Sequence, residues 1–319
     1  MISPTFLLLL STLTVCSCVY INGKECRLLD MTYDLSDETI VYPLALHKDN
    51  RFKSKSIQRG MVQSMPIYDP FYVYMGAFSM VEHQGTHIDA PQHVLKNDKA
   101  LGGLHTIDQA CVIDIPSAHK NNLDYHVTVN DLLAWEREHG RIHSRCIVIL
   151  RTGFEVYGND PQRFYGLDGP LQTTKTGWLT NTHWPGLSPK AAAWLVKHRN
   201  LRAIGTDAPG PDPGNQIDMH NSVHTAVLGE NRLILEALTN VAQLPNRGAT
   251  MFAMPLKLKG KSGGPARVFA IGWAGESDPC RLVRDHVMSA APAQTGSSTL
   301  IVAVVVIASI WMAGWTMQI

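Results

Sequence analysis

Short apolar runs, many containing β-branched residues, recur along this chain and restrict its fold more than any other feature. Runs of about four to eight such residues are typical of buried β-strands. The runs predict strands at residues 110–115, 146–150, 201–205, 251–258 and 266–273. We therefore expect a fold built around a β-sheet.

Helix signals lie between these runs. A helix is predicted from Ser188 to His198. Ser188 is a good N-cap, Pro189 suits the first helical position, and basic residues occupy the last turn. Residues 129–139 and 222–238 are also predicted to be helical. Because a few helices are scattered among strands without regular alternation, we predict a single mixed-sheet α/β domain.

The N-terminal part of the chain has an apolar run at residues 6–15. Ten residues are too few to cross a hydrocarbon core of about 30 Å, and residues 16–18 are small, as at a signal-peptidase site. We predict a signal peptide at residues 1–18 and a mature domain at residues 19–290. The chain is therefore expected to enter the secretory pathway.

The C-terminal residues 300–319 contain no charged side chain and are long enough to span a bilayer. Small residues at 289–291 and a polar spacer at 292–299 precede them, in the order of a glycosylphosphatidylinositol (GPI) signal. No basic residue follows the apolar run, although a stop-transfer helix normally has one. For residues 291–319 we favour a GPI signal over a single-pass transmembrane helix, and we expect membrane anchoring at the cell surface.

Charge and composition exclude two broad classes. The 28 Lys and Arg balance 27 Asp and Glu, and no basic run is interleaved with aromatic residues, so nucleic acid is not an expected partner. With 45% hydrophobic and 17% charged residues, the chain does not have the composition of a disordered protein.

The sequence does not determine which cysteines form disulfides. Export permits disulfides, and Cys26 with Cys280 could join the two ends of the domain, but a sequence does not fix connectivity. Cys111 and Cys146 lie in strand-like runs, and we interpret them as buried small apolar residues.

The clearest chemistry lies in the segment His-Gln-Gly-Thr-His-Ile-Asp-Ala-Pro-Gln-His at residues 83–93. The imidazoles of His83, His87 and His93 and the carboxylate of Asp89 fall within these eleven residues. Imidazole nitrogen and carboxylate oxygen are donors for Zn²⁺ or Mn²⁺, and one Asp can offer an oxygen to each of two ions. The spacing therefore predicts a metal site.

The local backbone of this segment is predicted to be a compact turn, because Gly85 and Pro91 oppose a continuous helix. The alternative interpretation is a histidine-rich surface loop. Val81, Ile88 and Ala90 are the apolar neighbours expected at the edge of a core, and they favour the metal site.

This signature, His-x-Gly-Thr-His-x-Asp-x-Pro-x-His, resembles that of the metal-dependent cyclase-type hydrolases, which include bacterial-type kynurenine formamidases and isatin hydrolases. The likeness covers about residues 29–269. Further matching segments are residues 29–36 with Pro43, 151–153, 185–189, 205–207, 235–240 and 255–257. The resemblance implies a cyclase-type domain with a swivelling β/β/α-like architecture, and a homodimer.

The resemblance also implies residue roles within the signature. His83, His87 and Asp89 match metal ligands of the family, and Asp89 matches the ligand that bridges to a second ion. His93 matches the catalytic acid/base group. The implied cofactors are one or two divalent ions, with Zn²⁺ expected before Mn²⁺.

The remaining ligands of the second ion in the family are a His and a Glu twelve residues later, which match His224 and Glu236. His220 lies four residues before His224 and would share its face on a helix. Without the resemblance, His224 would be interpreted as a helix-surface residue and Glu236 as a solvated charge.

Together these features predict a hydrolase of amide bonds that uses metal-activated water, with His93 transferring a proton. The first expected substrate is N-formylkynurenine, giving kynurenine and formate, and the alternative is the opening of a cyclic amide such as isatin. Aromatic candidates for the substrate pocket are Tyr42, Tyr72, Tyr74 and Trp184.

Two other classes are weighed against this prediction. Gly260-Lys-Ser262-Gly-Gly264 matches the nucleophile elbow of serine α/β-hydrolases, but an elbow needs a helix after it, and residues 266–273 are strand-like. We predict a hairpin turn instead. A surface-anchored binding protein without turnover is the other alternative, and the complete set of candidate ligands disfavours it.

Overall fold

The computed structural model describes residues 18–21, 24–40, 52–62, 71–96, 100, 106–115, 120–170, 172, 179–216 and 222–272. Most of the predicted signal peptide, all of the predicted tail, Tyr42, His220 and Cys280 lie outside these residues, as do the side chains of Cys26, Tyr72 and Tyr74. Within the described ranges, none of the helices combines the length and the apolarity that crossing a bilayer requires.

A nine-stranded mixed sheet organises the described residues, in the order β1-β2-β13-β12-β6-β8-β10-β11-β5, and β5 also pairs with β13. The second pairing of β5 closes part of the sheet on itself, like a barrel. The strands of this sheet are β1 (Cys18–Ile21), β2 (Lys24–Asp30), β5 (His87–Asp89), β6 (Thr106–Asp114), β8 (Ile147–Arg151), β10 (Ala203–Thr206), β11 (Leu233–Glu236), β12 (Arg247–Pro255) and β13 (Gly263–Ile271).

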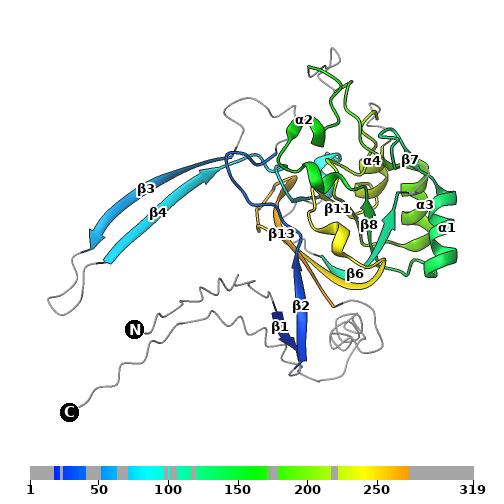
Figure 1. Ribbon diagram of the computed structural model, residues 1–319, viewed down its shortest axis with the longest axis horizontal. Helices are drawn as coiled ribbons and strands as arrows, with labels where there is room; N and C mark the ends of the chain where they lie inside the picture. Colours follow the sequence, from blue (N-terminus) through cyan, green and yellow to red (C-terminus); the bar gives the residue numbers. More distant parts are fainter. Residues whose placement is uncertain are drawn as a thin grey trace, which may run out of the picture.

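Helices cover one face of this sheet. They are α1 (Val129–His139), α3 (Pro189–Arg199) and α4 (Val223–Leu228), whereas α2 (Pro161–Phe164) packs through Phe164 in a separate apolar cluster. Turns of 3₁₀ helix lie at Pro91–His93, Phe154–Tyr157 and Val241–Gln243. Figure 1 shows α1, α3 and α4 gathered beside β8 and β11. Side-chain caps begin these helices: Thr128 and Asp131 form a capping box on α1, and Ser188 caps α3 ahead of Pro189.

The sheet separates two apolar cores because side chains alternate along each strand. On β8, Ile147 and Ile149 point into the closed part of the sheet, whereas Val148 and Leu150 pack under the helices. On β11, Leu235 belongs to the first core and Ile234 to the second. Side chains of β11 on the second face therefore lie against α4. At this face, polar side chains of the strands can meet polar side chains of the helix.

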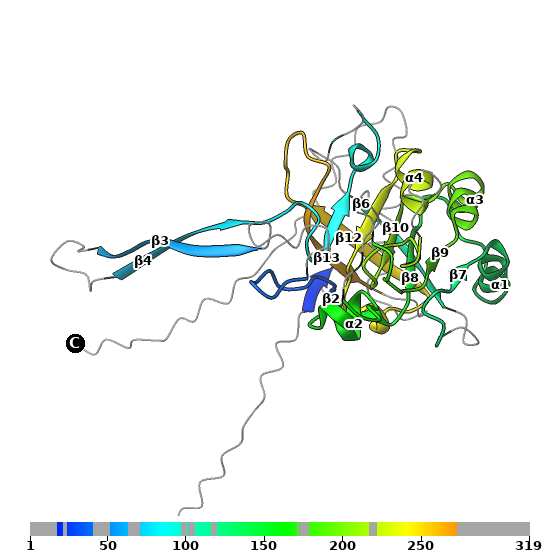
Figure 2. The same cartoon turned by 90° about the horizontal axis from the view of Figure 1, so that it is seen from above.

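Two further sheets are small. β7 (His126–Val127) and β9 (Gly186–Leu187) pair in parallel, and β3 (Lys53–Val62) pairs with β4 (Phe71–Ser79) in an antiparallel ribbon. Both views show this ribbon extending away from the rest of the described structure (Figures 1 and 2). The chain leaves β4 at Ser79 and enters the histidine segment directly, so the base of the ribbon adjoins that segment.

The strand predictions and two helix predictions are confirmed. β6, β8, β10, β12 and β13 overlap the five predicted strands, and α1 occupies the predicted residues 129–139. The predicted helix at 222–238 is wrong in its second half, because α4 ends at Leu228 and β11 follows. Asn231 there has a positive φ of 57°, which stops the helix before the apolar run of β11.

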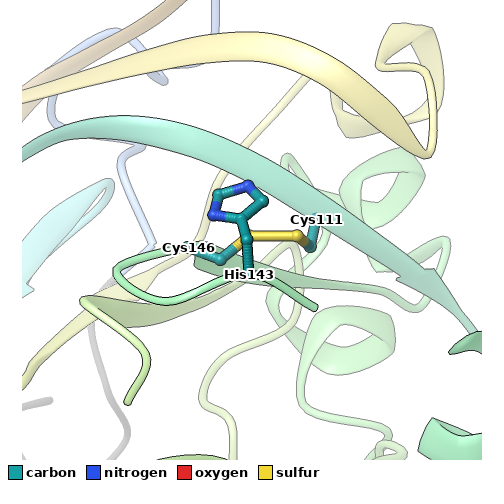
Figure 3. Close-up of side chains that lie close together, drawn as sticks. All are labelled: Cys111, His143 and Cys146. Atoms are coloured by element: carbon teal, nitrogen blue, oxygen red, sulfur yellow. A yellow bond between two sulfur atoms is a disulfide. The ribbon is translucent and has the colours of Figure 1, made fainter. Parts of the chain in front are cut away.

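Cys111 and Cys146 are buried, as predicted, but they form a disulfide and are not separate apolar residues (Figure 3). Cys111 lies opposite Val148 in the parallel pairing of β6 with β8, and Cys146 stands two residues before Val148 on the same face. The two thiols are therefore diagonal neighbours on adjacent strands, with Cα atoms 6.2 Å apart. His143 lies beside them, but the bonded sulfurs offer no thiolate to a metal ion.

The Gly-x-Ser-x-Gly segment is part of the connection between β12 and β13, which pair antiparallel. β13 begins at Gly263, so a strand and not a helix follows Ser262. The predicted hairpin turn is confirmed. The arrangement lacks the helix that a nucleophile elbow requires.

Candidate metal centre

The short strand β5 carries the centre of the site. It lies between β11 and β13, with His87 opposite Glu236 and Asp89 opposite Ile234. Residues directly opposite share a face of a sheet, so His87, Asp89 and Glu236 point to the same side while Ile88 points into the apolar core. Gly85, with a φ of 60°, makes the turn that leads into β5.

The side chains of His87, Asp89 and Glu236 converge at this face and are buried. His87 Nε2 is 3.2 Å from Glu236 Oε2 and 3.4 Å from Asp89 Oδ1. Three of the converging atoms, His87 Nε2, Asp89 Oδ2 and Glu236 Oε1, are buried without a hydrogen-bond partner. Such orphaned polar atoms are costly unless another group satisfies them.

His224 reaches the same carboxylates from α4. Its Nε2 is 3.1 Å from Glu236 Oε1 and 3.4 Å from Asp89 Oδ2. Asp212 fixes the ring by accepting a hydrogen bond from Nδ1 at 2.5 Å, and it also accepts from the backbone N–H groups of Val223 and His224. Asp212 therefore positions both the first turn of α4 and the imidazole that the helix carries.

His83 approaches Asp89 from the other side. Its Nδ1 is 2.7 Å from Asp89 Oδ1, and its Nε2 is 2.9 Å from Ser262 Oγ. A Cβ atom on Gly263 would come within 2.4 Å of the His83 ring, so glycine at this position makes room for the imidazole.

His93 stands at the end of the 3₁₀ turn Pro91–His93 and is more exposed than the other five residues of the centre. Its ring lies 4.0 Å from the His83 ring and 5.8 Å from the His224 ring, measured between centroids. Surrounding protein atoms desolvate the imidazole and lower its pKa to about 4, although the charge of Asp89 opposes this shift. A ring nitrogen of His93 lies within 4.8 Å of donor atoms of His83 and Asp89, so His93 borders the centre, although it is not one of the three orphaned groups.

The electrostatics of the buried residues show how strongly the centre attracts positive charge. Burial opposes protonation of His87 and His224, yet the neighbouring carboxylates of Asp89, Glu236 and, for His224, Asp212 outweigh it, raising the pKa of His87 to about 10 and that of His224 well above its ordinary value. Burial would raise the pKa of Asp89, but its imidazole neighbours, His83 first among them, hold it well below its usual range.

The hydrogen bonds of the imidazoles fit a divalent cation. His87 Nδ1 donates to the Gly85 carbonyl at 2.8 Å, and His224 Nδ1 donates to Asp212, so a neutral ring presents its Nε2 lone pair to the carboxylates. Lone pairs and carboxylate oxygens repel one another unless a cation lies among them. Imidazole with carboxylate is a donor set for Zn²⁺ and Mn²⁺, and outer hydrogen bonds of this kind orient metal-binding histidines.

A cavity of about 770 Å³ opens above this centre. His83, His87, His93, His224 and Glu236 line its polar end. The remaining described lining is largely apolar and aromatic, and includes Val81, Leu95, Phe164, Tyr165, Leu179 and Trp184. The indole N–H of Trp184 donates to the carbonyl of Asp212 at 2.7 Å, which connects the aromatic wall to the loop beside His224.

The structure brings together all six residues that the resemblance selected. Those six residues are His83, His87, Asp89, His93, His224 and Glu236. Of the four aromatic candidates for the pocket, Trp184 lines the cavity.

Sequence reasoning missed Asp212, Ser262 and Glu82. Ser262 had been considered only as a nucleophile, and its place beside His83 depends on a pairing between strands remote in sequence. No pattern in the sequence indicated Asp212 or Glu82.

Fold and site together define a mixed α/β protein with a buried centre of imidazoles and carboxylates beneath an apolar cavity. The chain belongs to the cyclase family, because the family model described as "Putative cyclase" matches residues 29–213.

The chain is similar to several hydrolases of this family. It is 28% identical to an isatin hydrolase of Roseibium aggregatum over 83% of this chain and 94% of that protein. A solved isatin hydrolase A from Ralstonia solanacearum superposes with a TM-score of 0.64 and 31% identity, covering 77% of this chain and 92% of that one. A kynurenine formamidase of Salinibacter ruber is 25% identical over 62% of this chain and 80% of its own length.

Proposed function

We propose that this protein hydrolyses an aryl amide with the help of one or two divalent ions held by His83, His87, Asp89, His224 and Glu236. The observation that carries the proposal is the convergence of His87 Nε2, Asp89 Oδ2 and Glu236 Oε1, all buried and without hydrogen-bond partners, at the floor of an open cavity. Bound divalent ions supply a water that is nucleophilic at neutral pH and polarise the amide carbonyl.

His93 is the group that we assign to proton transfer. It faces the cavity at the edge of the centre, and desolvation by surrounding protein atoms lowers its pKa to about 4, which favours a neutral imidazole that can accept a proton. In the hydrolysis, water oxygen bonds to the carbonyl carbon, the C–N bond breaks, and a proton passes from the water to the leaving nitrogen. His93 would take and return that proton.

The preferred substrate in this proposal is a cyclic aryl amide of the isatin type. The similarity to isatin hydrolases extends over most of both chains, and the aromatic wall formed by Phe164, Tyr165 and Trp184 suits a planar ring next to the polar floor. N-formylkynurenine is the second candidate, supported by the similarity to kynurenine formamidases.

The first test is turnover by the purified full-length protein. We expect it to open isatin or to deformylate N-formylkynurenine, to lose activity after chelation, and to regain it with Zn²⁺ or Mn²⁺. The measurement is product formation by absorbance alongside metal content. A reagent that modifies active serines should leave the rate unchanged. Turnover that persists in metal-free protein would contradict the proposal, and metal binding without turnover of either amide would favour a binding protein.

We further propose that the protein is exported and held at the cell surface by a GPI anchor. The Cys111–Cys146 disulfide supports export, because disulfides persist in oxidising compartments and are rare in the cytosol. The uncharged residues 300–319, preceded by a polar spacer, support the anchor.

Phosphatidylinositol-specific phospholipase C applied to expressing cells should therefore release the protein into the medium, because this enzyme cleaves the lipid from a GPI anchor. Release is measured by immunoblot of cells and medium, and cells treated with heat-inactivated enzyme are the control. Protein that stays on the membrane with residues 300–319 intact by mass spectrometry would instead indicate a transmembrane helix.

A further inference from the structure

Ser262 and Glu82 form a relay behind His83, on the side away from the cavity floor. The Ser262 hydroxyl and the Ser262 backbone N–H both donate to Glu82 Oε2 at 2.9 Å. We assign the hydroxyl hydrogen of Ser262 to Glu82, and with this assignment the Ser262 oxygen accepts the hydrogen bond from His83 Nε2 at 2.9 Å. The carboxylate thus fixes the direction of the hydroxyl, and the hydroxyl fixes the tautomer of His83.

The tautomer has a direct consequence for the centre. A neutral imidazole carries one N–H, and Ser262 engages it at Nε2, so Nδ1 presents a lone pair. That lone pair faces Asp89 Oδ1 at 2.7 Å. In this tautomer, Nδ1 and Asp89 Oδ1 are two acceptors whose lone pairs a metal ion bound beside them would satisfy. The relay therefore prepares His83 to bind a cation through Nδ1, whereas His87 and His224 present Nε2.

We propose that Ser262 and Glu82 are positioning residues that set the metal affinity of the half of the centre that contains His83. This inference rests on the proposed function and adds a residue pair outside the ligand set.

The other half of the centre has its own support. Asp212 holds His224 through Nδ1, just as Ser262 holds His83 through Nε2. The two halves share Asp89, whose Oδ1 faces His83 and whose Oδ2 faces His224. Removing Ser262 should therefore weaken one binding step and spare the other, and removing the Asp212 charge should do the reverse.

The experiment titrates the metal-free full-length protein with Zn²⁺ and, separately, with Mn²⁺ by calorimetry. Ser262→Ala is expected to weaken one binding step by about 10–100-fold, the usual effect of losing an outer partner of a metal ligand. Glu82→Gln keeps Ser262 in place and should weaken the same step. Excess metal should restore much of the lost turnover in both variants.

Controls separate this effect from a general disturbance. Lys261 pairs with the other oxygen of Glu82 at 3.1 Å and is half exposed, so Lys261→Met should change metal affinity by no more than about twofold. Asp212→Asn should weaken the step that Ser262→Ala spares. Substitution with Co²⁺ gives a second readout, because the visible absorption of Co²⁺ should change in Ser262→Ala and remain as in the parent in Lys261→Met.

The outcomes distinguish the two proposals. If the parent protein binds neither Zn²⁺ nor Mn²⁺, the proposed function is overturned. Parent protein that binds metal, with Ser262→Ala and Glu82→Gln binding it equally well, would overturn the role of the relay alone. Melting temperatures of all variants are measured first, and if Ser262→Ala does not fold, Glu82→Gln decides the question.

Discussion

Asp89→Asn should abolish most metal binding and nearly all activity. Asp89 is fully buried, and its two oxygens face different histidines, Oδ1 toward His83 and Oδ2 toward His224. A neutral amide cannot bridge two cations as a carboxylate can, and it leaves the nearby imidazoles without a counter-charge. Since losing an outer partner alone costs about 10–100-fold, losing the shared ligand should lower turnover by more than about 100-fold.

Metal content by plasma mass spectrometry and turnover at saturating substrate check this prediction. Asp108→Asn is the matched control, because Asp108 is also a buried aspartate but pairs with Arg145 and Arg202, outside the candidate centre. That variant should keep the metal content and turnover of the parent protein. Full metal occupancy with normal turnover in Asp89→Asn would remove the candidate centre from consideration.

The fold was predictable where the sequence pattern is local. The alternation of Ile147, Val148, Ile149 and Leu150 between two cores appears in the sequence as one short apolar run, which suits a strand covered on both faces. The cap at Ser188 and the proline after it mark the start of α3 in the same local way. These two elements can therefore be predicted without information from residues that are distant in the sequence.

The error after residue 228 has a different cause. The run Leu233-Ile-Leu is too short for periodicity to distinguish a strand from a helix. Its conformation is decided by pairing with β10 on one side and β5 on the other. Glu236 consequently looks like a solvated charge in the sequence and becomes a buried member of the centre in the structure.

The signature between His83 and His93 predicted one half of the centre, because its residues are close in sequence. They lie on strand β5 and the 3₁₀ turn after it, and not on one compact turn as predicted. The partners that orient the imidazoles were not predictable in the same way. Ser262 is 179 residues from His83, and the contact exists only because β13 starts beside β5. Cys111 and Cys146 likewise meet through the register of β6 with β8.

The second large effect is expected for His93→Ala, which should lower kcat by about 10²–10⁴-fold while metal content stays near that of the parent. His93 faces the cavity beside the centre, and the family resemblance assigns it the acid/base role and assigns the ligand roles to the other five residues. The loss corresponds to about 3–5 kcal/mol of transition-state stabilisation, as expected when a general acid/base group is removed.

Two comparisons decide between proton transfer and a merely structural role for His93. His93→Gln keeps a polar side chain that can accept or donate a hydrogen bond, but it cannot carry a proton, so it should be as inactive as His93→Ala if His93 is the acid/base group. The rings of His93 and His83 lie 4.0 Å apart, so a structural role would instead act through the position of His83. In that case metal affinity would fall, and excess Zn²⁺ or Mn²⁺ would restore turnover. Activity restored by metal would remove His93 from the catalytic role and leave the hydrolase assignment in place.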